Sequence, residues 1–135
     1  MFEVDTSWPK PLPGGWINGQ VGGNCVDSHD HSVIVARRNI TEEEQETSMA
    51  TPSIIMFDKL GYMVRAWGDP DVVPDSIQGC TFDNDNNVYV AGNGDAIVQK
   101  YSHEGSFCCR SESAANSIRW MAPKREKRST LPKIA

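Results

Sequence analysis

The stretch GNCVDSHDHSVIVA, residues 23–36, returns later in the chain as GCTFDNDNNVYVA, residues 79–91. Each copy starts at a glycine, runs through apolar residues to an aspartate, passes a polar turn and ends in a β-branched run. Short β-branched runs separated by turn-forming residues are typical of β-hairpins. The chain is therefore expected to repeat a β-structured unit.

A second hairpin is expected after each copy. The run IIMFD, residues 54–58, leads to a turn at Gly61, and IVQKYS, residues 97–102, leads to a turn at Gly105. Four-stranded units of about 40 to 50 residues, which bury a face by stacking on their neighbours, are typical of propeller blades. We therefore predict an all-β fold, a partial β-propeller of about two four-stranded blades with an irregular C-terminal tail. The expected divisions are a Pro/Gly-rich lead-in, a first blade, a second and incomplete blade, and a basic tail: 1–19, 20–68, 69–107 and 108–135.

Two segments lie outside the repeated pattern. The lead-in places three prolines and two glycines between residues 9 and 15, so we expect it to be extended or turning. An acidic insert at 39–53 lengthens the first blade, and charge runs of this kind are usually solvated. Thr41 and Glu44 have the spacing of a capping box, which favours a solvated loop or one helical turn.

The composition favours a folded chain. A hydrophobic fraction of 39% and a charged fraction of 23% do not suggest wholesale disorder. No apolar run approaches the roughly 20 residues of a membrane span, and the first residues lack the features of a signal peptide. The four cysteines do not have a CxxC spacing, and they are not dense enough in the sequence to indicate a disulfide framework. We interpret Cys25 and Cys80 as small buried apolar residues.

The tail differs in charge from the body. Residues 1–107 hold 6 Lys/Arg and 16 Asp/Glu, whereas residues 108–135 hold 7 and 2. After the turn at Gly105 the run FCCRS, residues 107–111, interrupts the alternation expected of a blade strand. We interpret the tail as translated out of frame, because restoring one base after the Phe107 codon yields an apolar strand that ends in glycine. Sequencing the gene across this codon tests the interpretation, under which the basic run does not indicate nucleic-acid binding.

Several motifs in order resemble one family. They are SWPKPLPGGWINGQVGG, VDSHDHSVIVARR, IIMFDKLGYMVRAWG and the long run from Gly79 to Phe107. Together they resemble the bacterial secreted NHL-repeat β-propellers related to peptidyl-α-hydroxyglycine α-amidating lyase. The resemblance covers nearly all of residues 2–107 and implies that the two blades are of the NHL type.

The resemblance also implies a catalytic site, which this chain does not complete. In the lyase, a zinc ion held by histidines from different blades acts with an arginine and a tyrosine, and Arg37 falls where the family arginine follows its strand. The ligand histidine expected before Gly79 is Gln78, and an amide is a poor zinc ligand. Arg37 is therefore the candidate catalytic residue, with a strand-end ion pair as its ordinary alternative.

The histidines and the acidic turn residues are expected to be structural. His29 and His31 have a spacing that suits a metal ion, but a solvated hairpin turn is the favoured interpretation, and His103 is likewise assigned to a turn. The run DNDNN, residues 83–87, imitates the start of a calcium loop, yet Gly94 stands where the twelfth-position glutamate would be. We predict no metal ligands in this chain, with zinc or calcium confined to a full-length parent.

These observations favour a fragment of an NHL-repeat β-propeller with a ligand- or protein-binding scaffold role and no complete active site. The alternative is a fragment of a zinc-dependent amidating-type lyase. The expected partner is a small molecule, a peptide or a protein, with neither nucleic acid nor a membrane span involved. We also expect association through open blade edges, because unpaired strands pair with other chains. The parent protein is expected to be secreted or periplasmic, although this chain shows no signal peptide.

Overall fold

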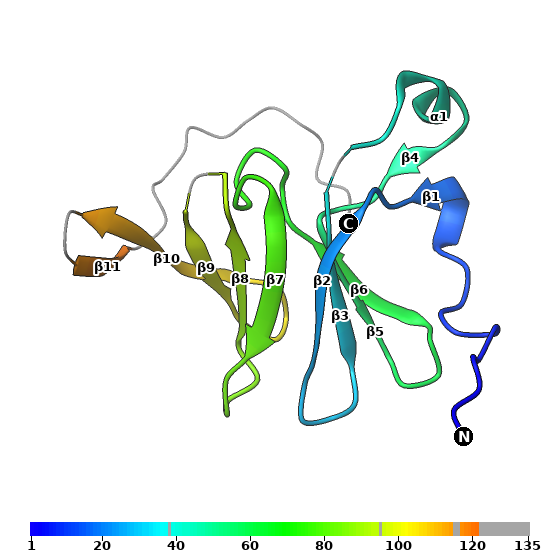
Figure 1. Ribbon diagram of the computed structural model, residues 1–135, viewed down its shortest axis with the longest axis horizontal. Helices are drawn as coiled ribbons and strands as arrows, with labels where there is room; N and C mark the ends of the chain where they lie inside the picture. Colours follow the sequence, from blue (N-terminus) through cyan, green and yellow to red (C-terminus); the bar gives the residue numbers. More distant parts are fainter. Residues whose placement is uncertain (38, 95, 115–116, 122–135) are drawn as a thin grey trace.

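The computed structural model describes residues 1–37, 39–94, 96–114 and 117–121, and most of its strands form two antiparallel sheets. The sheets stand side by side, as adjacent propeller blades do (Figure 1). We call them the first blade and the second blade. This arrangement confirms the expected all-β, partial propeller-like fold.

Each blade begins with its innermost strand and proceeds outward without a crossover. The first blade has the order β2-β3-β5-β6, and the second has β7-β8-β9-β10-β11. The first comprises β2 (Val21–Val26), β3 (Ser32–Ala36), β5 (Ile54–Phe57) and β6 (Met63–Trp67). The second comprises β7 (Ile77–Phe82), β8 (Val88–Gly92), β9 (Val98–Tyr101), β10 (Phe107–Ala114) and β11 (Ser117–Met121).

Both blades carry a β-bulge at the same place in their inner hairpin. The pairing of β2 with β3 shifts between Val21 and Gly23, and that of β7 with β8 shifts between Ile77 and Gly79. The additional residue is Gly22 in the first blade and Gln78 in the second. The two copies therefore correspond residue by residue along their inner strands, as the repeated sequence predicts.

The second blade continues past the boundary expected at residue 107. β10 pairs with β9 through Tyr101 and Lys100, which face Phe107 and Cys109, so Cys108 is the additional residue of a bulge. The first blade has the same bulge at Val64. The interrupted alternation of FCCRS is thus a bulge of the repeat. The out-of-frame interpretation stays a prediction, and much of that tail, 115–116 and 122–135, lies outside the described residues.

Four hairpin turns share one hydrogen-bonding scheme. In each, the first residue donates its backbone N–H to the carbonyl four positions later and accepts that residue's N–H on its side-chain oxygen. The fourth residue of each turn has a positive φ, which asparagine, aspartate and glycine tolerate best. The first residues are Asp27, Asp58, Asp83 and Ser102, and the positive-φ residues are Asp30, Gly61, Asn86 and Gly105.

The core lies between the two blades. Apolar side chains on alternate positions of β3 and β5 form one buried cluster with those of β8 and with Tyr101 of β9. Gln99 is also buried in the second blade, where it accepts a hydrogen bond from the Tyr101 hydroxyl at 2.7 Å and donates to the Val72 carbonyl at 2.5 Å. Since the apolar surface is shared, each blade supplies the other with much of its core.

The insert and the lead-in pair with each other beside the first blade (Figure 1). The insert forms the helix α1 (Glu42–Thr47), which Thr41 and Glu44 close with the expected capping box. The short strand β4 (Met49–Ala50) pairs in parallel with β1 (Trp16–Ile17) of the lead-in. The lead-in, which was expected to be extended or turning, contains a short 3-10 helix at Pro13–Gly15. Within the described part of the chain, no helix is long and apolar enough to cross a membrane.

Candidate functional site

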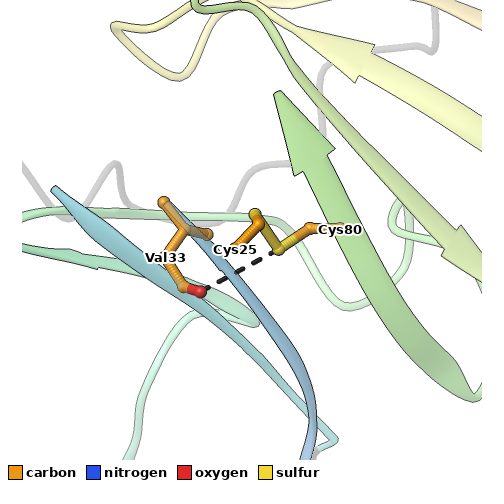
Figure 2. Close-up of a disulfide and its surroundings, with 3 residues drawn as sticks. All are labelled: Cys25, Val33 and Cys80. Carbon is orange, nitrogen blue, oxygen red and sulfur yellow. Dashed lines mark hydrogen bonds between the residues drawn. A yellow bond between two sulfur atoms is a disulfide. The ribbon is translucent and has the colours of Figure 1, made fainter. Parts of the chain in front are cut away.

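A disulfide joins the innermost strands of the two blades. Figure 2 shows Cys25 on β2 bonded to Cys80 on β7, with a Cα–Cα distance of 5.7 Å. The Cys80 sulfur also lies 3.9 Å from the Val33 carbonyl oxygen. The interpretation of these cysteines as small buried apolar residues is therefore wrong. They are partly buried and covalently bonded, across a separation of 55 residues.

Glycines allow the two strands to approach closely enough for this bond. A Cβ added at Gly23 would lie 2.7 Å from the Gln78 carbonyl oxygen, and one added at Gly22 would collide with that of Ile77. When the copies are aligned on Gly23 and Gly79, the cysteines differ by one position, so the repeat alone does not pair them. The Cα–Cα distance lies within the range that disulfides span.

All three histidines of the chain gather at the turn end of the inner strands. Nδ1 of His31 lies 2.7 Å from Oδ2 of Asp27, and Nε2 of His103 lies 2.6 Å from the same oxygen. His31 belongs to the β2–β3 turn, and His103 to the β9–β10 turn of the second blade. The ring centroids of His31 and His103 are 5.6 Å apart, and His29 is 6.3 Å from the first and 6.4 Å from the second. The blades therefore build this cluster jointly.

Asp27 is the centre of the cluster. Its side chain is 0% exposed, whereas those of His31 and His103 are each 26% exposed. Burial by itself raises the pKa of Asp27. The hydrogen bonds from His103, from the backbone and ring of His31 and from the backbone of His29 outweigh burial and hold this pKa well below its ordinary value of 3.8. Asp27 is therefore a buried carboxylate that accepts four hydrogen bonds.

The second blade has a counterpart of this turn without histidines. Asp83 accepts from the backbones of Asp85 and Asn87, as Asp27 does from those of His29 and His31, and Nδ2 of Asn87 lies 3.1 Å from Oδ2 of Asp83. An asparagine thus serves this turn where the first blade has His31. The acidic run at 83–87 is explained by turn hydrogen bonds, which agrees with our interpretation of it.

Arg37 lies at the other end of β3 from His31. Its guanidinium donates to the Ile77 carbonyl at 3.4 Å and to Oε1 of Gln20 at 3.2 Å. It lines a cavity of about 370 Å³ that is bounded by Ala36 and Ser53 of the first blade, by residues 73–76 of the connection between the blades and by Ile77 of β7. The described residues place no carboxylate within ion-pair distance of the guanidinium, so the ordinary alternative of a strand-end ion pair is not what the structure has.

Sequence reasoning located Arg37 and missed the histidine cluster. Arg37 follows its strand as expected, and Gln78 is an exposed bulge residue of β7. His29, His31 and His103 do lie in turns, as predicted, but these turns meet. The available signal was that His31 replaces Asn87 in an otherwise equivalent turn, which turn chemistry does not require.

Neither a protein-family model nor a curated protein matches the chain.

Proposed function

We propose that the chain is part of an NHL-repeat β-propeller related to the peptidyl-α-hydroxyglycine α-amidating lyases, and that it acts as a ligand-binding scaffold without a complete active site. The observation that carries the binding role is the guanidinium of Arg37 at the wall of the cavity between the blades. Its described hydrogen bonds go to two neutral acceptors, the Ile77 carbonyl and Oε1 of Gln20.

A partly satisfied guanidinium at a cavity wall suits an anionic ligand. Arginine presents several donors in a planar fork, which matches the two oxygens of a carboxylate. Ser53 and Asn39 line the same cavity and add neutral hydrogen-bonding groups, and the carboxylate of Asp75, which also lines it, accepts a hydrogen bond from the backbone of Ser76. We therefore assign the site to a small molecule or peptide that carries a carboxylate.

The test compares an acid with its amide. Isothermal titration of the chain with N-acetylglycine and with N-acetylglycinamide is expected to show tighter binding of the acid by about 10- to 100-fold, the range of a charge-assisted hydrogen bond. Arg37→Gln should abolish this preference, and Lys59→Gln, which removes one charge from an exposed turn, should leave it unchanged. Equal binding of acid and amide, or an unaltered preference in Arg37→Gln, would refute the proposal.

The turn histidines are not placed to act together with Arg37. Arg37 and the three histidines lie at opposite ends of β3, and the six residue steps of extended chain from His31 to Arg37 span about 20 Å. The resemblance implies that the arginine and the histidine-held zinc ion work together, so the turn histidines of this chain do not correspond to the zinc ligands of that family.

The disulfide bears on the cellular compartment of the parent protein. Disulfides persist in oxidising compartments, so the Cys25–Cys80 bond supports the proposal that the parent protein is secreted or periplasmic. Association through open blade edges also stays a proposal, supported by the exposure of apolar residues such as Val64 on the edge strand β6.

A further inference from the structure

The cluster at the β2–β3 turn offers three metal-ligating atoms. Oδ2 of Asp27, Nδ1 of His31 and Nε2 of His103 all lie within 4.8 Å of one another. One carboxylate and two imidazoles form a donor set that divalent zinc and its neighbours in the first transition row accept. We propose that Asp27, His31 and His103 bind one divalent transition-metal ion of the zinc class at the junction of the two blades.

Turn chemistry does not require these histidines. The second blade forms the same turn with Asn87 hydrogen-bonded to Asp83, so the fold needs no imidazole at this position. His103 comes from a different turn, 76 residues from Asp27 in sequence, and it still reaches the same carboxylate oxygen. Two imidazoles that converge on one buried carboxylate from separate blades provide a donor set for a cation.

The required movement is small. A tetrahedral ion with bonds of about 2.0 to 2.1 Å separates its ligand atoms by roughly 3.3 Å. The Asp27–His31 and Asp27–His103 contacts of 2.7 and 2.6 Å must therefore open by about 0.6 to 0.7 Å to admit the ion. Each imidazole would then carry its proton on the other ring nitrogen and present a lone pair to the metal.

The surroundings favour a site with an open fourth position. Asp27 is fully buried and held by the backbones of His29 and His31, which fixes one ligand before the metal arrives. The His31 and His103 side chains are partly exposed, so water has access to the remaining position. Arg65 donates to the His103 carbonyl oxygen at 2.6 Å and thereby holds the β9–β10 turn against the first blade.

The experiment uses the disulfide-bonded chain with Cys108 and Cys109 replaced by serine, because free thiols also bind metals. After treatment with a chelator and its removal, the chain is titrated with zinc chloride by calorimetry and with cobalt chloride by visible absorption. We expect one ion per chain and the intense absorption of low-coordinate cobalt. His31→Asn copies the turn of the second blade, so it should fold normally and bind at least about 100-fold more weakly, as should His103→Asn.

Two control variants make the outcome decisive. Asp83→Asn alters the equivalent turn of the second blade, and His29→Asn removes the third histidine. Both should bind zinc as the parent chain does. The proposal is overturned if the parent chain does not bind, if His31→Asn and His103→Asn bind as well as the parent, or if His29→Asn loses as much affinity as they do. None of these readouts depends on the carboxylate site at Arg37.

Discussion

Replacing Cys25 and Cys80 by serine should cost the fold about 4 kcal/mol. The disulfide closes a loop of 55 residues. By the loop-closure relation, a cross-link of this length lowers the entropy of the unfolded chain by about 14 cal/mol/K. At 25 °C this entropy amounts to about 4 kcal/mol. Domains are stable by about 5 to 15 kcal/mol in total, so the bond accounts for a large share.

The assay is urea unfolding followed by tryptophan fluorescence, in the presence of a chelator. With a slope of about 2 kcal/mol per molar urea, the double serine variant should unfold at a midpoint about 2 M lower than the parent chain. Cys108→Ser with Cys109→Ser serves as the control, because both thiols are free, and it should leave the midpoint unchanged. A shift below about 0.5 M in the Cys25/Cys80 variant would refute the reasoning, since the blades would then be held by packing alone.

Two further predictions concern the turns. The pKa of Asp27 is lowered in the folded state, so its contribution to stability is complete above the unfolded pKa of about 3.9 and is lost as pH falls through the lower folded value. In chelator, the stability difference between the parent chain and Asp27→Asn should therefore narrow from pH 5 to pH 2 in urea titrations; a constant difference would contradict this. Gly105 has a φ of +86° and an added Cβ would lie 2.9 Å from the Trp67 ring, so Gly105→Ala should lower the unfolding free energy by about 1 to 3 kcal/mol. Gly79→Ala, whose Cβ would meet open space, is the control and should change it by less than about 0.5 kcal/mol.

The blades were predictable from sequence because their signals are local. Glycine at positions 61 and 105 and aspartate at 27, 58 and 83 define the hairpin turns, and the turns set the register of the strands between them. The helix of the insert was predictable for the same reason, since Thr41 and Glu44 form their capping box within one turn. A bulge is harder to foresee. At Cys108 it interrupts the alternation as the end of a blade would, although β10 continues to Ala114.

The links between the blades were not predictable, because they depend on how the sheets stack. Cys25 and Cys80 stand one position apart when the repeats are aligned, and their pairing needs the close approach that Gly22 and Gly23 allow. His103 meets Asp27 only because the outer hairpin of the second blade folds back onto the inner turn of the first. A pattern read along one chain segment contains no information on such a contact.

One strand end makes both links. Cys25 and Asp27 lie two residues apart, at the end of β2 and just beyond it; the first is bonded to the inner strand β7, and the second is hydrogen-bonded to the outer turn that holds His103. These attachments differ in direction, so the second blade cannot turn about the disulfide without separating Asp27 from His103. The stacking of the blades is therefore fixed at two points, and the three ligand atoms of the proposed metal site are brought together by the fold before any ion binds.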